Sequence, residues 1–589
     1  MKNPLLFYQQ EKENFEQQLA TLNSKLSSIR FFRFIVFLST AFAIYMFFEN
    51  RIVMIVSAVL GITVFIWLVL KYINLQRKKQ IVKAKIEINS VEISVLNGNF
   101  SKLENGKEFS NSNHFYSNDI DLFGDGSLFQ YINRTETLQG KSNLAKTLLA
   151  NKIDGILERQ NAIKELDEKV NFRQHFSALA SLNIVKKSTD SVSKWIKNYS
   201  NVFPVYLSKI PLLFSGISLL IVGLISFGVI QFSILVIWFF IGLFVTAGFI
   251  KKTSKLYKEI DEIGVIFKQY YQLLQQIENE NFITKNLKEK QEIITLEQKK
   301  ASNIFKEFSK ILDAFDNRNN DIIAVVGNGL FLMEIKNACK VEKWISNYKH
   351  TVEKWFDVVA FFDAQNSLAN FNFNHPNYTF PVLNRAKNII KSESLGHPLL
   401  NFEKRIDNDF TIEKEQFFIV TGANMAGKST FLRTVSLTIV MANIGLPVCA
   451  KKMEYNPIKL ITSMRTSDSL AEEESYFYAE LKRLKFIVDK IASEEYFIIL
   501  DEILKGTNSK DKAIGSKKFV EKLSNSNSTG IIATHDVSLC VLEDEFKNIE
   551  NYFFDAEINE DELYFDYTLK KGICKNMNAS FLLKKMEII

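Results

Sequence analysis

Four long, uncharged apolar segments constrain the fold of this chain more than any other feature of its sequence. They are residues 34–48, 52–70, 210–230 and 232–250. A helix needs roughly 20 apolar residues to cross the hydrocarbon core of a bilayer. Three segments reach that length, and the first reaches it when Phe31 and Phe32 are added and Arg33 extends toward the headgroups. Helices buried in a soluble core usually keep a polar stripe. These segments have none, so we expect four membrane spans rather than four core helices.

The short links within each pair of segments predict two helical hairpins. Only "ENR" at 49–51 and Gln231 separate the paired segments, which leaves no room for a domain. Positive residues flank the outer ends of both hairpins, and Arg51 in the first turn is an exception. The flanking residues are Lys25, Arg30, Arg33, Arg77, Lys78, Lys79, Lys209, Lys251, Lys252 and Lys255. By the positive-inside rule we expect a multi-pass membrane protein with four helices and its soluble parts in the cytoplasm.

Composition limits the class of protein further. A chain of 589 residues holds several domains, and 47% hydrophobic with 24% charged residues argues against wholesale disorder. The formal charge of +7 is weak evidence for a polyanionic partner, because Lys and Arg beside membrane spans account for it. The four cysteines form no CxxC pair, which argues against a disulfide framework or zinc site, and residues 1–30 do not resemble a signal peptide.

The soluble remainder changes character near residue 385. Upstream, residues 80–200 and 253–370 alternate polar and apolar residues at helical spacing, as in the long amphipathic segment 255–280. Downstream, the runs "QFFIVTG", "EYFIILDE" and "TGIIATHD" have the composition of strands and are separated by helical stretches. That alternation predicts a parallel sheet with crossover helices.

The segment "TGANMAGKST" (421–430) predicts a loop that binds the phosphates of a nucleotide. It fits G-x-x-x-x-G-K-[ST] and stands between a predicted strand and a predicted helix, which is the context the motif requires. Its glycines let backbone N–H groups turn toward the phosphates. Lys428 would reach the β- and γ-phosphates, and Ser429 would ligate Mg²⁺. The expected nucleotide-binding residues are Gly422, Ala423, Asn424, Met425, Ala426, Gly427, Lys428, Ser429 and Thr430.

Two later strand ends would add polar groups to the same site. The run "YFIILDE" ends in Asp501, which would hold Mg²⁺, and Glu502, which would orient and polarise the attacking water. The run "IIATHD" ends in Thr534 and His535. A polar residue there would lie beside the γ-phosphate, but a lone histidine is as often structural, so both roles stay open for His535.

These residues resemble the MutS family of DNA mismatch-repair ATPases, members of the ABC-type ATPase superclass. The loop is similar to the family's TGPNMGGKST, and "LDEILKGTNSKD" (500–511) is similar to LDEIGRGTSTYDG. The segment "SDSLAEEESYFYAEL" (467–481) is similar to SDDLASGRSTFMVEM, which implies that Ser475 meets the γ-phosphate of the opposite subunit. The resemblance also implies ATP and Mg²⁺ as ligands, a homodimer, double-stranded DNA as a partner, and Tyr567 packed on the adenine.

The resemblance is weaker in the helical region and includes departures. Residues 126–149, 159–166 and 356–383 look like the start and end of the family's lever domain, and "GHPLL" (396–400) is similar to its R-H-P. No mismatch-reading domain fits before residue 126, and the second hairpin stands where the family inserts a DNA-gripping clamp. The chain also has Leu504 and Tyr476 where the family usually has Gly and Thr. We expect the family's C-terminal helix-turn-helix to be shortened or missing.

We therefore expect a multidomain chain, with an α-helical lever region and two transmembrane helical hairpins followed by an α/β P-loop NTPase domain of the ABC type. Its expected parts are a cytoplasmic helical segment (1–30), a first hairpin (31–72), the first part of the lever (73–209), a second hairpin (210–250), the second part of the lever (251–384) and the ATPase domain (385–589). The expected function is a membrane-embedded ATPase in which ATP hydrolysis drives dimer and lever movements, with DNA as a candidate ligand. The alternatives are an ABC-type membrane motor and a nucleotide-switched scaffold without DNA.

Overall fold

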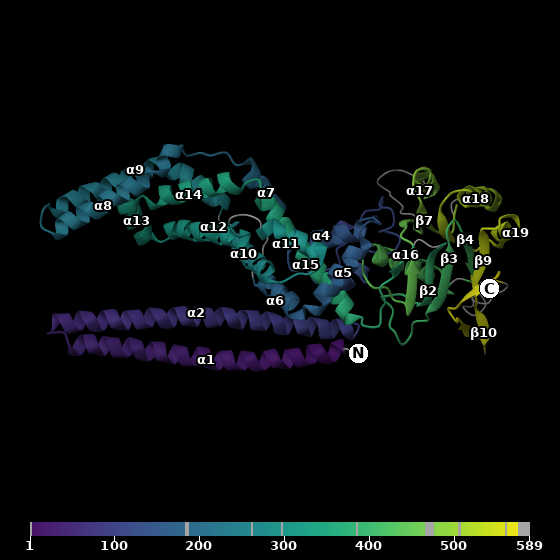
Figure 1. Ribbon diagram of the computed structural model, residues 1–589, viewed down its shortest axis with the longest axis horizontal. Coiled ribbons are helices and arrows are strands. Elements are labelled where there is room, and N and C mark those ends of the chain that lie inside the picture. The colour runs from purple at the N-terminus through teal and green to yellow at the C-terminus, as the bar shows by residue number, and fades with distance from the viewer. Residues whose placement is uncertain are drawn as a thin grey trace.

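The chain is helical as far as Asn374 and forms a mixed α/β domain after it (Figure 1). This computed structural model describes residues 3–182, 188–260, 263–295, 299–384, 387–423, 425–465, 476–504, 508–559 and 562–574. The order of the two regions is the one that the sequence predicts.

The first two helices form a long antiparallel hairpin, hairpin 1, made of α1 (Pro4–Met46) and α2 (Arg51–Leu96). Its turn lies at the end of the molecule opposite the sheet domain (Figure 1). The helices touch near the middle of their apolar segments, because a Cβ on Gly61 would lie only 2.1 Å from Oγ1 of Thr40. Small residues of this kind let helix backbones approach closely.

A second hairpin, hairpin 2, consists of α8 (Ile210–Ser226) and α9 (Phe232–Ile260). Its turn lies at the same end of the molecule as the turn of hairpin 1 (Figure 1). In the described part of the chain, four helices are long and apolar enough to cross a membrane: α1, α2, α9 and the helix that ends at Ser226. A fifth candidate, which the sequence analysis did not identify, is the bent pair α13 (Asp321–Phe331) and α14 (Met333–Tyr348).

The remaining helices form the lever region. Most of them pack around an aromatic-rich core that includes Phe267, Phe305, Trp344 and Trp355, whereas Phe129 and Leu144 of the first two pack in the core of the sheet domain. The predicted amphipathic segment 255–280 is helical on both sides of the two residues that are not described. The helices of this region are α3 (Leu128–Ile132), α4 (Leu138–Leu149), α5 (Ile156–Glu168), α6 (Val170–Ser181), α7 (Thr189–Asn198), η2 (Val205–Ser208), α10 (Ile263–Asn279), α11 (Lys285–Thr295), α12 (Ala301–Asp316), η3 (Asn317–Asn319) and α15 (Val352–Asn374).

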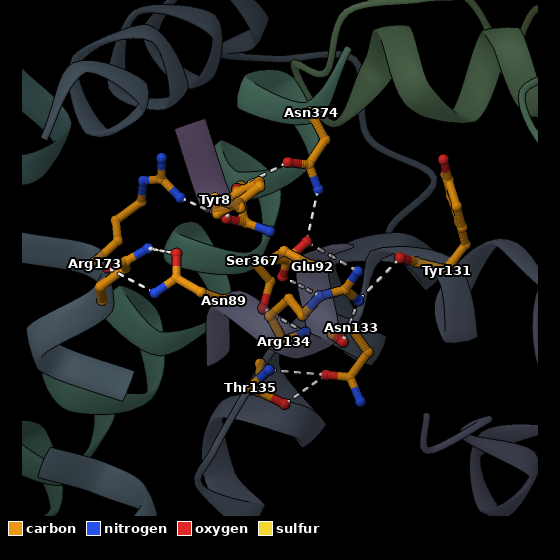
Figure 2. A network of polar contacts seen from close by, with 12 residues as sticks. Tyr8, Asn89, Glu92, Tyr131, Asn133, Arg134, Thr135, Arg173, Ser367 and Asn374 are labelled. Atoms are coloured by element: carbon orange, nitrogen blue, oxygen red, sulfur yellow. Dashed lines mark hydrogen bonds and ion pairs between the residues drawn. The ribbon is translucent and has the colours of Figure 1, made fainter. Parts of the chain in front are cut away.

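A buried polar cluster, the junction network, fastens the base of hairpin 1 to the end of α15 (Figure 2). The Tyr8 hydroxyl donates to Oδ1 of Asn374 at 2.8 Å, and Nδ2 of Asn374 donates to Oε2 of Glu92 at 2.8 Å. Glu92 also pairs with Nε of Arg134 at 2.6 Å. Burial, with a further contribution from Glu92, raises the pKa of Tyr8, which keeps its hydroxyl a neutral donor. Since Asn374 is the last residue of α15, the network holds hairpin 1 beside the entry to the sheet domain.

The sheet domain is built on six strands in the order β12-β9-β4-β8-β7-β6, parallel except for the edge strand β12. The three runs that the sequence analysis assigns to strands are β4, β7 and β8, paired side by side in parallel. The strands are β4 (Phe417–Gly422), β6 (Lys459–Ser463), β7 (Tyr496–Asp501), β8 (Thr529–Ala533), β9 (Ile549–Phe554) and β12 (Leu569–Lys571).

Helices cover both faces of this sheet because its strand residues are apolar on both sides. Phe418 and Val420 pack in the same core as α16 (Lys428–Asn443), whereas Phe417 and Ile419 pack in the core shared with α17, α18 and α19. A smaller sheet in the order β1-β5-β2-β3 lies on the α16 side, and β10 and β11 form a separate pair. These elements are α17 (Tyr476–Ile491), α18 (Ser509–Ser524), η4 (Val537–Val541), α19 (Leu542–Glu545), β1 (Val382–Leu383), β2 (Asn388–Leu395), β3 (Asn408–Glu413), β5 (Lys452–Tyr455), β10 (Glu557–Asn559) and β11 (Glu562–Tyr564).

Candidate nucleotide site

The loop between β4 and α16 has the backbone shape that the glycine motif predicts. Gly422 and Gly427 have φ angles of 147° and 103°, in the region that favours glycine. A Cβ on Gly422 would lie 2.7 Å from the carbonyl oxygen of Phe554, so this position has no room for a side chain. The loop ends where α16 begins, and the free N–H groups of a helix N-terminus attract anions.

Lys428, the first residue of α16, points back into this loop. Its Nζ donates to the carbonyl oxygens of Gly422 at 2.7 Å and Ala423 at 2.9 Å. Burial lowers the pKa of Lys428, while the carboxylates of Asp501 and Glu502 act in the opposite direction. Two backbone carbonyls thus hold the ammonium group. A bound phosphate would replace them as its partners.

Ser429 and Asp501 meet at the edge of the sheet. Oγ of Ser429 donates to Oδ2 of Asp501 at 2.8 Å, although the two residues are 72 positions apart. Asp501 ends β7, and Ser429 lies in the first turn of α16, so the parallel sheet and its crossover helix bring them together. A hydroxyl and a carboxylate side by side are hard oxygen donors of the type that Mg²⁺ prefers.

Glu502 and His535 form the other side of the site. Nε2 of His535 lies 3.1 Å from Oε1 of Glu502 and 3.3 Å from Nζ of Lys428. Glu502 has a φ of 53°, and its N–H donates to the carbonyl oxygen of Ala533 at 2.9 Å. A left-handed backbone at a non-glycine residue costs free energy and often marks a functional position. Here it turns the carboxylate toward the lysine and the histidine.

These groups line one cavity of about 590 Å³, which is large enough for a nucleotide. Tyr567 lies in its wall beside the loop, since a Cβ on Gly427 would be 3.0 Å from Cδ1 of its ring. The rest of the wall has both polar and apolar side chains. Its apolar residues include Leu395, Leu400, Ile406, Phe431 and Phe554.

Five polar residues of this cavity have no role in the sequence analysis: His397, Lys404, Arg405, Asn408 and Thr434. His397 and Arg405 lie in the wall, and burial, reinforced by Arg433 and Arg405, lowers the pKa of His397 to about 4. Asn408 binds the backbone of the segment that carries Tyr567. Its Nδ2 donates to the carbonyl oxygen of Tyr567 at 3.1 Å, and its Oδ1 accepts from the N–H of Leu569 at 2.7 Å. The match of "GHPLL" (396–400) includes His397, but nothing in the sequence indicates that Asn408 lies against Tyr567.

The structure thus brings together most of the expected site residues. Ala423, Met425, Gly427, Lys428, Ser429, Thr430, Asp501, Glu502, His535 and Tyr567 line the cavity, and Gly422 and Ala426 complete the loop. Asn424 and Ser475 lie outside the described residues.

Leu504, which stands where the family usually has Gly, lies two residues after Glu502. It adopts a φ of 59°, and its N–H donates to Oε1 of the buried Glu480 at 2.6 Å.

A magnesium nucleotide fits this set of residues. The buried ammonium of Lys428 and the N-terminus of α16 supply positive charge where phosphates would lie. Ser429 and Asp501 supply two oxygen ligands, and Mg²⁺ usually takes one or two protein ligands together with substrate phosphates and water. The apolar side chains of the wall and the ring of Tyr567 suit a purine base.

Comparison with known proteins identifies the sheet domain. Residues 418–585 match the family model of MutS domain V. The chain is 28% identical over 274 residues to MutS protein homolog 4 of Homo sapiens, covering 44% of this chain and 28% of that protein. It is 31% identical over 272 residues to the DNA mismatch repair protein MutS of Finegoldia magna, covering 45% of this chain and 30% of that protein.

The same relationship extends to other bacteria. The DNA mismatch repair protein MutS of Clostridium botulinum is 31% identical over 250 residues, covering 41% of this chain and 26% of that protein. The chain thus spans less than a third of the length of the curated relatives it matches. The matched region contains the loop, both carboxylates and His535. Residues 418–585 thus match MutS domain V, and through this C-terminal domain the chain is related to MutS proteins.

Proposed function

We propose that this chain is a membrane-embedded ATPase, in which binding and hydrolysis of ATP by the sheet domain moves the lever helices and the hairpins joined to them. The observation that carries the proposal is the convergence of Lys428, the Ser429–Asp501 pair and the Glu502–His535 pair in one cavity. The family relationship of residues 418–585 supports it.

Each group has a role that follows from its chemistry. Lys428 would bind the β- and γ-phosphates, and Glu502 would accept the proton of the attacking water. His535 lies within 3.3 Å of Lys428 and 3.1 Å of Glu502, where it would hold that carboxylate in place and sense the γ-phosphate. Ser429 and Asp501 would hold Mg²⁺, which neutralises phosphate charge when bound.

We further propose that the working unit is a homodimer. The cavity is open on one side to solvent, and Ser475 would reach it from a second subunit. In that arrangement ATP bridges two sheet domains, so that binding closes the dimer and hydrolysis releases it. The lever helices would carry this movement.

The bilayer is the partner that the two hairpins support best. Only between 6% and 22% of the most apolar stretch of each of the four helices is buried within the protein. Soluble monomers rarely expose contiguous apolar patches above a few hundred Å². The exposed side chains include Phe34, Phe37, Phe42, Val56, Val59 and Trp67 of hairpin 1, and Leu212, Leu219, Leu220, Phe240 and Phe244 of hairpin 2.

Both hairpin turns lie at one end of the molecule, so a single bilayer would accommodate both (Figure 1). The Lys and Arg residues that follow the apolar segments then face the cytoplasm together with the lever and sheet domains. The junction network would transmit movement, because Glu92 and Tyr8 of hairpin 1 are bonded to Asn374 at the entry to the sheet domain (Figure 2).

Double-stranded DNA is a second candidate ligand. A basic surface supports it, and two of the relatives are DNA mismatch repair proteins. A cavity of about 710 Å³ between α2, α6 and α10 is lined by the cations Arg77, Lys78 and Lys85, and also by Glu280. Clustered cations of this kind bind phosphate backbones, with an affinity that falls steeply as salt rises. DNA would then act on the lever at the base of hairpin 1.

The test is ATP hydrolysis by the purified chain in nanodiscs, with and without duplex DNA. We expect magnesium-dependent turnover that is lost in Lys428→Ala. Stimulation by duplex that disappears at high salt would add the DNA role, whereas unchanged turnover with duplex would remove it. Tight ATP binding without turnover would contradict the proposed ATPase and favour a nucleotide-switched scaffold.

A further inference from the structure

Helix α13 places apolar side chains on the surface of the lever region. Its sequence, "DIIAVVGNGLF", begins with one charge and then runs apolar to Phe331. Ile322 is 76% exposed, and Ile323, Val325 and Val326 are between 42% and 48% exposed. Burying a Val or Ile side chain is favourable by about 1.5–3 kcal/mol relative to full exposure. Water is therefore a poor environment for four β-branched side chains so close together.

The other end of α13 is packed tightly against hairpin 2. The Ser218 hydroxyl of α8 donates to the carbonyl oxygen of Leu330 at 2.6 Å. On α9, a Cβ on Gly242 would lie 2.3 Å from the carbonyl oxygen of Gly329. The Phe239 ring covers Gly329 from the other side, where a Cβ would lie 2.2 Å from it. Glycine and serine at such contacts are typical of helices that associate inside a membrane.

These contacts fix the depth of α13 relative to hairpin 2. Ser218 follows Lys209 by nine residues, and Gly242 precedes Lys251 by nine residues. At 1.5 Å per residue, each contact lies roughly 13 Å from the basic end of its helix. Half of a hydrocarbon core of about 30 Å is close to this distance. The end of α13 therefore lies near the level of the bilayer midplane if hairpin 2 spans the membrane.

Both flanks of α13 return to the cytoplasmic side of hairpin 2. Before it, Nη2 of Arg318 donates to Oγ of Ser254 at 2.7 Å, and Nδ2 of Asn319 donates to the Tyr257 hydroxyl at 2.8 Å. After it, the chain bends by 83° into α14, where Glu334 accepts from Oγ1 of Thr253 at 2.6 Å. Thr253, Ser254 and Tyr257 all follow the basic pair Lys251–Lys252.

We propose that α13 is a fifth membrane element, a re-entrant helix that inserts among the acyl chains of the cytoplasmic leaflet and leaves on the same side. The proposal rests on the proposed membrane location of hairpin 2. Lipid is the occupant because the exposed face lies between the level of Gly242, where α13 ends, and that of Ser254, where it begins, and Leu213 and Ile250 of hairpin 2 are also exposed in this interval. Since α12 and α14 join α13 to the lever core, lever movement would change how deeply this helix lies in the leaflet.

The test measures the depth of single labelled cysteines in nanodiscs. An environment-sensitive fluorophore is attached to Val326→Cys, to Val59→Cys in hairpin 1 and to Ile283→Cys in the loop after α10, all exposed positions. Quenching is measured with doxyl-labelled lipids and with aqueous iodide. The unsubstituted chain gives the background, since three of its cysteines are buried and Cys339 is half-buried.

We expect lipid quenchers to remove most of the emission at Val326 and Val59, and iodide to quench only Ile283. Iodide quenching at Val326 with protection at Val59 would overturn the re-entrant helix and leave the membrane location intact. Iodide quenching at both positions would overturn the membrane location itself. Val325→Cys repeats the measurement from the neighbouring exposed position, should Val326→Cys fail to fold, and the same outcomes apply.

Discussion

The sheet domain and the hairpin end of this protein use the same apolar side chains in opposite ways. Phe417, Phe418 and Ile419 are at most 1% exposed in the central strand of the sheet, whereas Phe240 and Phe244 of α9 are 62% and 82% exposed. In the sheet domain the apolar side chains form the core, whereas at the hairpin end they form the surface itself. An apolar core suits a domain in water and an apolar surface suits lipid, so under the proposed function the connection between the two regions is the part that couples them.

The sheet domain is tested most strongly by Glu502→Gln. Loss of the carboxylate leaves the attacking water without a base, so we expect turnover to fall by about 10²–10⁴-fold while ATP binding is retained. Steady-state phosphate release and nucleotide retention on the protein measure the two effects. Glu495→Gln, an exposed change at the opposite end of the same strand, should leave both unchanged. Equal turnover in the wild type and Glu502→Gln would remove this residue from the chemistry.

The connection between the two regions is tested by Glu92→Ala in the junction network. This change leaves Arg134 and Asn374 without their buried partner, so we expect a loss of about 3 kcal/mol in the free energy of unfolding. Chemical unfolding in detergent, followed by tryptophan fluorescence, measures it. Glu87→Ala lies on the same helix at an exposed position and should change stability by less than about 0.5 kcal/mol. Similar small losses in both variants would show that the network does not hold hairpin 1.

The hairpin end is tested by Gly242→Val, which places a side chain against the backbone of Gly329. We expect this overpacking to cost about 1–3 kcal/mol and to loosen α13 from hairpin 2. Gly248→Val on the same helix is the control, because a Cβ there meets nothing within 4 Å. Thermal unfolding in nanodiscs compares the two. A Gly248→Val protein that is as unstable as Gly242→Val would argue against a close α9–α13 contact.

A smaller effect is expected at Leu504, where the left-handed backbone lies two residues after Glu502. Alanine and glycine both remove the buried side chain, but only glycine relieves the backbone strain. We therefore expect Leu504→Gly to be more stable than Leu504→Ala by about 1 kcal/mol, the reverse of the usual order of these residues in helices. Unfolding midpoints in denaturant measure the difference, and a more stable alanine variant would contradict the strain.

Much of the fold is predictable from the sequence because its signals are local. Alternating β-rich runs and helical stretches identify β4, β7 and β8, and the glycine motif locates the loop and the start of α16. The parallel sheet then brings Ser429 and Asp501 together across 72 positions, since strand ends meet at one edge. The four long apolar segments likewise identify the helices of both hairpins.

The features that the sequence analysis missed depend on contacts between distant segments. Asn408 meets Tyr567 across 159 positions, and the junction network joins four segments that carry no shared motif. Helix α13 lies within the segment 251–384 that the sequence predicts as lever; its 11 residues are too few for a span, and two glycines interrupt its apolar pattern. Only its packing on Ser218 and Gly242 reveals its depth.

The central claim is that the nucleotide cycle in the sheet domain moves helices that lie in a bilayer. The most direct measurement is the distance between spin labels on Phe48→Cys and Phe227→Cys, at the exposed turns of hairpins 1 and 2, in nanodiscs. We predict that magnesium–ATP trapped by Glu502→Gln gives a distance distribution different from that of the nucleotide-free protein. An identical distribution in both states, in protein whose wild-type form hydrolyses ATP, would contradict the coupling.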